Sequence, residues 1–86
     1  MILAIDPGNK KSAYVVLEDD LKPGEFGKVS CAHVRDIVIP TLVDLYPRIT
    51  LAIEMVASYG MPVGREVFET CFWAGMFWQA ANVKEK

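Results

Sequence analysis

The sequence lacks the features that would assign it to a membrane, secreted or strongly charged class of protein. No apolar run approaches the roughly 20 residues of a membrane span, and no basic leader precedes an apolar core at the N-terminus. The formal net charge of −2 gives no global basic field, so the charge permits nucleic-acid binding without indicating it. We therefore expect a cytoplasmic protein that does not contact a membrane.

Cysteine is also scarce. Cys31 and Cys71 lie in apolar surroundings without a Cys-x-x-Cys spacing, so we expect two reduced, buried thiols and no metal site built on them. A composition of 52% hydrophobic and 23% charged residues is typical of one ordered domain over residues 1–86. A domain of this size buries only about 60 to 65% of its unfolded surface, so it is marginal unless a partner or further chain covers it.

Two short apolar segments each end in an acid. Residues 2–5 form an unbroken apolar run, too short for a helix, which is typical of a strand covered on both faces. This run ends at Asp6. Residues 49–53 form a second such run, which ends at Glu54.

A tight turn follows the first acid. Pro7 presets its own φ and Gly8 can supply a positive φ, so the chain is expected to turn back into a second strand over residues 12–17. Asp6 has an alternative explanation here, because an Asp that opens such a turn often only bonds nearby backbone amides. Residues 18–27 then predict a surface loop.

The middle of the chain predicts a crossover connection. Residues 28–34 are expected to form a third strand, in which His33 has a structural role. Residues 37–46 carry apolar side chains near helical spacing, with Pro40 acceptable in the first turn. A helix at this place lets the strand over residues 49–53 lie beside the first strand and parallel to it.

That arrangement would give the two acids a chemical role. Neighbouring strands are about 4.8 Å apart, so carboxylates at the same end of two parallel strands can converge on one hard cation. Asp6 and Glu54 are therefore candidate ligands of Mg²⁺, with Mn²⁺ as an alternative. An ion held in this way can also bind a phosphate oxygen and activate water.

The last predicted element is an apolar helix over about residues 63–82. We expect one of its faces to pack on the sheet, the face made by Gly64, Val67, Phe68, Cys71, Gly75 and Trp78. The opposite face carries Trp73 and Phe77, which a domain of this size is not expected to cover. These two residues are therefore candidates for an interface with a second copy or with further chain.

These motifs resemble the opening of RuvC-like nucleases in the RNase H-like superfamily. The similarity rests on Ile-Leu-Ala-Ile-Asp-Pro-Gly with its return strand, and on Leu51-Ala-Ile-Glu54 before a glycine-containing loop and a long helix. It covers nearly the whole chain. It implies an α/β fold in the order β-β-β-α-β-α: an antiparallel start of three strands, a crossover helix, a parallel fourth strand and a long second helix.

The resemblance also implies a function. Asp6 and Glu54 would be magnesium ligands in an endonuclease acting on branched DNA such as Holliday junctions, a reaction of DNA recombination. Lys10 and Lys11 could approach a phosphate, although ordinary solvated lysines are the simpler explanation for both. Tyr59, in the loop after Glu54, would stack on an unpaired base.

One departure from the family leaves other functions open. RuvC-like enzymes have further acids beyond a fifth strand, and this chain ends at Lys86 before either element, so we expect an incomplete domain. A homodimer through the second helix and the exposed sheet edge would cover what is missing. The alternatives are a noncatalytic nucleic-acid-binding or assembly module of the same fold, and a fragment of an actin-like or sugar-kinase-like ATPase.

Overall fold

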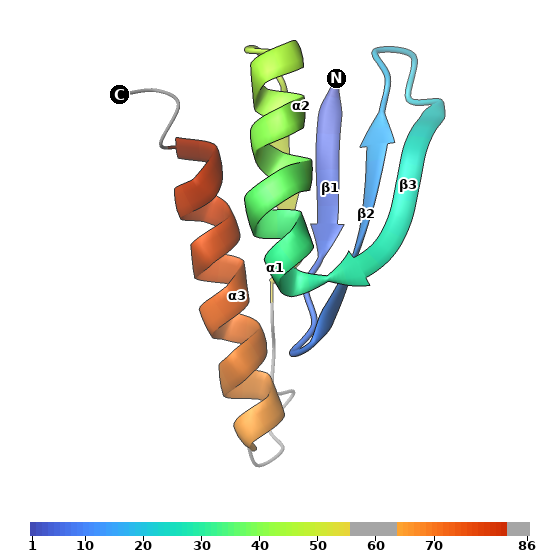
Figure 1. Cartoon of the computed structure of the whole chain (residues 1–86). Coiled ribbons are helices and arrows are strands. Elements are labelled where there is room, and N and C mark those ends of the chain that lie inside the picture. Colours follow the sequence, from blue (N-terminus) through green and yellow to red (C-terminus); the bar gives the residue numbers. More distant parts are fainter. Residues whose placement is uncertain (56–63, 83–86) are drawn as a thin grey trace.

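The computed structural model describes residues 1–55 and 64–82, in which one mixed β-sheet carries its helices on a single face (Figure 1). The strands are arranged in the order β3-β2-β1-β4. In chain order the elements are β1 (Ile2–Asp6), β2 (Lys11–Leu17), β3 (Pro23–Ser30), α1 (Cys31–His33), the π-helical turn η1 (Val34–Val38), α2 (Ile39–Leu45), β4 (Thr50–Ile53) and α3 (Arg65–Asn82).

Strand β1 lies between an antiparallel and a parallel neighbour. Ile5 is opposite Tyr14 of β2 on one side and Ile53 of β4 on the other. The parallel pairing of β1 and β4 confirms the prediction from the crossover helix. It also leaves β4 at one edge of the sheet and β3 at the other.

Alternation along the strands divides the sheet into a covered and an uncovered face. Leu3, Ile5 and Val16 point toward the helices and are buried. The helical layer completes this core with Cys31, Val34, Val38, Ile39, Leu42 and Phe77. The opposite side, which we call the open face, carries the alternate positions of each strand and no helix of the described residues packs on it (Figure 1).

The third strand begins and ends earlier than the sequence predicted. Residues 28–34 were expected to be extended, but β3 ends at Ser30 and the chain turns directly into a helix. The reason is a helix cap, because the Ser30 hydroxyl accepts a hydrogen bond from the His33 N–H at 3.1 Å. His33 is therefore an exposed helical residue, and residues 23–27, predicted as loop, belong to β3.

The crossover helix, predicted over residues 37–46, begins at Cys31 instead. It changes from α-helix to π-helix and back shortly before Pro40. The helical run continues from α1 through η1 into α2, where Pro40 is the second residue. Proline lacks an N–H, and its ring clashes with the carbonyl four residues earlier. In η1 the Ile39 N–H donates to the Val34 carbonyl five residues back, a wider turn that accommodates an interior proline.

Helix α3 packs through the face that was predicted to be exposed. Phe77 is fully buried, and Trp73 is partly buried against the core. The Arg35 guanidinium lies 5.2 Å from the centre of the Trp73 ring, and its Nη1 is 3.9 Å from Met76 Sδ. The prediction that these two residues are left uncovered for an intermolecular interface is therefore wrong for Phe77, which this chain buries completely, while Trp73 is covered only in part.

The other face of α3, predicted to pack on the sheet, is largely exposed. Phe68 and Trp78 of this face are 66% and 59% exposed, and the neighbouring Phe72 is 67% exposed. Cys71 is exposed instead of buried as predicted. Space is also open where a side chain would extend from Gly75. None of the helices within residues 1–55 and 64–82 is long and apolar enough to cross a membrane.

Candidate functional site

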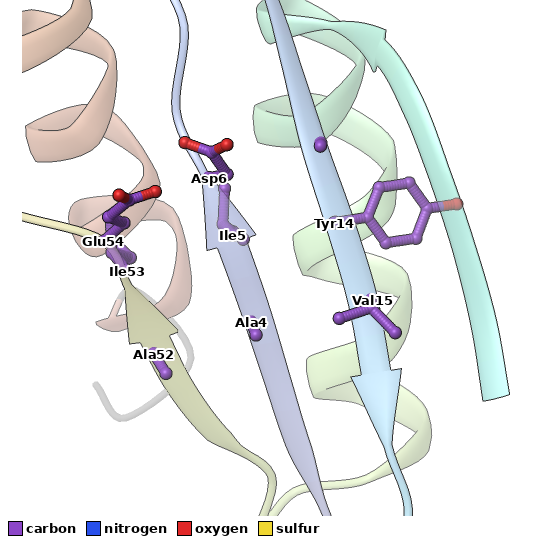
Figure 2. A pocket seen from close by; sticks show the side chains of 9 residues that line it. Ala4, Ile5, Asp6, Tyr14, Val15, Ala52, Ile53 and Glu54 are labelled. Atoms are coloured by element: carbon purple, nitrogen blue, oxygen red, sulfur yellow. The ribbon is translucent and has the colours of Figure 1, made fainter. Parts of the chain in front are cut away.

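Two carboxylates meet at the ends of neighbouring parallel strands (Figure 2). Asp6 is the last residue of β1, and Glu54 directly follows β4. The Glu54 N–H donates to the Ile5 carbonyl at 3.0 Å, so the ladder between the two strands continues up to the acids. Both side chains are exposed and project on the open face. Their position at the same end of two parallel strands is as the sequence predicted.

The nearby Asp6 carboxylate affects the protonation of Glu54. The neighbouring Asp6 carboxylate raises the pKa of Glu54, first through a hydrogen bond to its protonated form and then through charge repulsion. Such a pair gains from any cation that binds between the two groups, because the cation removes the repulsion. The electrostatics therefore favour a shared positive ligand.

The surface beside Asp6 and Glu54 is recessed because the residues that line it are small. Ala4, Ala13 and Ala52 line an open hollow of about 510 Å³ together with the two acids. Larger side chains at these positions would fill the space in front of the carboxylates. The hollow therefore gives a ligand direct access to the acids.

The described residues offer two acidic ligands and no more. They contain no group of three or more His, Cys, Asp or Glu side chains placed to hold one metal ion. Magnesium commonly keeps several waters and is bound through one or two carboxylates plus substrate phosphates. Asp6 and Glu54 fit that pattern, since both are exposed and have room in front of them for water and phosphate oxygens.

A buried ring of hydrogen bonds holds the turn that follows Asp6. The Gly8 N–H donates to Ser12 Oγ at 3.1 Å, and the Cys31 thiol donates to the Gly8 carbonyl at 3.3 Å. Ser12 Oγ and Cys31 Sγ are 3.3 Å apart. Because the thiol proton is already used, the Ser12 hydroxyl is the donor to sulfur, which closes a ring of three bonds.

This ring is well protected from solvent. Ser12 and Cys31 are each 1% exposed, and the Cys31 N–H adds a bond to the Lys10 carbonyl at 2.9 Å. The ring fixes both ends of the turn to the start of α1, and so fixes the backbone on which Asp6 sits. Sequence reasoning missed this role; the signal was Ser12, a small polar residue that precedes a largely apolar segment of the strand.

Gly8 is required here for a different reason than predicted. Its φ is not in the left-handed region, so the turn does not use the conformation that glycine alone adopts freely. A Cβ at this position would instead collide with the Lys11 carbonyl. The residue is therefore needed because two backbone segments approach closely.

The other predicted site residues are only partly placed. Lys10 lies in the turn after Asp6 and is exposed, and Lys11 opens β2 on the open face, two residues before Ala13. Tyr59 lies outside the described residues. The candidate site is thus Asp6 and Glu54, with Lys11 on the same face of the sheet.

Comparison of the chain with protein-family models, with curated proteins and with solved structures returned no match.

Proposed function

We propose that this chain is a RuvC-like, magnesium-dependent endonuclease domain of the RNase H-like superfamily. The observation that supports it best is the meeting of Asp6 and Glu54 at the ends of adjacent parallel strands, next to an open hollow. Two mutually repelling carboxylates, which form no ion pair with a basic residue in the part of the chain that the structure describes, suit a hard divalent cation. The strand order and the early Asp-Pro-Gly turn agree with the resemblance seen in the sequence.

The two carboxylates would hold the ion and leave its other coordination positions to water and phosphate oxygens. Asp6 and Glu54 would each supply carboxylate oxygens. The small side chains of Ala4, Ala13 and Ala52 leave room in the hollow for water and for a phosphodiester. A bound Mg²⁺ or Mn²⁺ would polarise the phosphate and lower the pKa of a bound water. The ring made by Gly8, Ser12 and Cys31 keeps the Asp6 backbone in place.

Branched DNA is the substrate that the resemblance favours. The test is cleavage of a labelled four-way junction in Mg²⁺ or Mn²⁺, with Asp6→Asn and Glu54→Gln variants alongside. We expect each substitution to lower cleavage by at least about 100-fold, since each removes half of the acidic ligand set. Glu18→Gln is the matched control, because Glu18 is an exposed acid at the other end of β2.

The outcomes of this experiment distinguish the nuclease from the two alternatives, a noncatalytic module and an ATPase fragment. Cleavage that both variants retain would show that the acids are not the site. Junction binding without cleavage by the unmodified chain would favour the noncatalytic module of the same fold. Release of phosphate from ATP, with no effect on DNA, would favour the ATPase alternative.

The proposal includes a homodimer, through a surface other than the predicted one. The exposed face of α3 presents Phe68, Phe72 and Trp78 around the open position at Gly75. Aromatic side chains bury about 150–250 Å² each, so three that are about two-thirds exposed supply some 300–500 Å². A standard interface needs about 800 Å² per partner, and the unpaired edge of β4 is available for the rest.

A further inference from the structure

The register of the sheet places a lysine in line with the two acids. On the open face, Asp6 is opposite Ala13 of β2, and Ala13 is opposite Lys28 of β3. The row across the sheet is therefore Glu54, Asp6, Ala13 and Lys28. Two strand spacings, about 10 Å, separate the backbone of Lys28 from that of Asp6, with only an alanine side chain between them.

A second lysine lies beside the first. Lys11 is on the same face of β2, diagonal to Lys28, a relation that brings residues within about 7–8 Å of each other. Both side chains are exposed, and neither takes part in an ion pair within residues 1–55 and 64–82. These two cations therefore remain available to an anionic ligand.

The open-face positions of β2 and β3 around the lysines carry no acid, and the nearby acid on the next strand is Asp6 itself, which is diagonal to Lys11. On the open face β2 presents Ala13, Val15 and Leu17, and β3 presents Ser30 and Phe26. The one acid of β3, Glu25, accepts a hydrogen bond from the Tyr14 hydroxyl at 3.0 Å, and Tyr14 shares its face of β2 with the buried Ser12 and Val16. The charge on this side of the hollow is thus positive, and on the other side negative.

An exposed aromatic residue adjoins the lysines. Phe26 is two residues before Lys28, so it lies on the same face, and it is 75% exposed. No core contact explains an aromatic ring on the open side of an edge strand. Aromatic rings on sheet surfaces are platforms for unstacked bases.

We propose that Lys28, Lys11 and Phe26 form a binding track for a single nucleic-acid strand that leads to the carboxylate pair. The lysines contact phosphates and Phe26 stacks on a base. The small alanine side chains that line the hollow let the nucleic-acid backbone lie close to the sheet. This assignment rests on the proposed function, since it supplies the strand to be cut. Charge complementarity favours a nucleic acid over a protein partner on this part of the sheet.

The test measures binding separately from cleavage. A fluorescently labelled single-stranded DNA is titrated with the chain in EDTA, at several salt concentrations, and anisotropy gives Kd. We expect Lys28→Ala to weaken binding about fivefold to tenfold and to lower the slope of log K against log salt by about 0.7, the value for one phosphate contact. Lys28→Arg should keep both affinity and slope.

Three further variants complete the design. Lys22→Ala is the matched control, because Lys22 is an exposed lysine of the β2–β3 turn that pairs with Asp20. Phe26→Ala should weaken binding by at least about fivefold without changing the salt slope, and Phe26→Tyr should keep it. Thermal melting of each variant excludes loss of fold as the cause.

The proposal is overturned if Lys28→Ala and Phe26→Ala bind the DNA as the unmodified chain does, or if they change self-association in sedimentation instead of DNA binding. The proposed nuclease function fails differently. If the binding changes occur but no metal-dependent cleavage is found, the track stands and the catalytic function does not. If cleavage depends on Asp6 and Glu54 but not on Lys28, the nuclease stands and the track does not.

Discussion

Single backbone positions around Asp6 have little freedom. Gly8 faces the Lys11 carbonyl so closely that no side chain fits, and its N–H and carbonyl are both bonded to buried groups, Ser12 and Cys31. Gly75 is the opposite case, a glycine within a helix with open space around it. The same residue type is thus required at one position and replaceable at the other.

We predict opposite effects for alanine at these two glycines. Gly8→Ala should lower the free energy of unfolding by about 1–3 kcal/mol, because the turn must move to admit the methyl group. Gly75→Ala should raise it by about 0.5–1 kcal/mol, because alanine costs less backbone entropy within a helix. Urea unfolding followed by tryptophan fluorescence measures both. A neutral Gly8→Ala would mean that the turn yields easily and does not fix Asp6.

At the scale of elements, α3 has two apolar faces with different roles. The face with Phe77 completes the core beside β4 and the crossover helices, and the face with Phe72 remains exposed. A helix that is apolar all round does not reveal by its periodicity which face packs. The preceding elements decided the choice, because they fix where α3 lies.

We predict that substitution of Phe77 affects the stability of the fold, whereas substitution of Phe72 affects self-association. Phe77→Ala should destabilise the fold by about 3–5 kcal/mol, since it empties a fully buried site. Phe72→Ala should leave the unfolding of the monomer nearly unchanged and weaken self-association in sedimentation velocity. Equal effects of the two substitutions on stability would contradict this assignment of the faces. A sedimentation coefficient that Phe72→Ala leaves unaltered would remove α3 from the proposed dimer.

At the scale of the whole molecule, the sheet is covered on one face and carries the acid pair and two lysines on the other. The acids lie at the ends of β1 and β4, and the exposed lysines Lys11 and Lys28 lie on β2 and β3. Folding brings the two acids side by side. This arrangement links stability to pH and to metal.

We predict that pH changes stability through the acid pair when metal is removed. The pKa of Glu54 is raised in the folded chain, so the folded state binds the proton more tightly than the unfolded state does. In a chelator, stability should therefore fall as pH rises from the ordinary range of a glutamate through the raised value. Thermal melts across this range should show the decline in the unmodified chain and not in Glu54→Gln.

Thermal melts in the presence of Mg²⁺ test whether the ion binds at the acid pair. Saturating ion should stabilise the unmodified chain by about 2.7 kcal/mol at a free concentration of 100 times its Kd, and should stabilise Glu54→Gln much less. Glu18→Gln serves again as the control and should respond like the unmodified chain. A metal response that is equal in all three proteins would place the ion elsewhere.

The sequence by itself determined the strands that carry the acids, their parallel pairing and the long last helix. These follow from local signals: short apolar runs, a Pro-Gly turn, a crossover of the right length and an apolar helical stretch. Asp6 and Glu54 could be found in this way because each directly follows such a run. The boundary between β3 and α1 could not, because the cap at Ser30 competes with an extended pattern that continues to Val34.

Only the tertiary structure decided which groups are covered and which remain free. Phe77 rather than Phe68 is buried, and Cys31 but not Cys71, because packing depends on the position of distant elements. Lys28 shares a row with Asp6 only through the register of three strands. Such relations join residues far apart in the chain, and no local pattern encodes them, so they are fixed only when the sheet pairs and the helices pack.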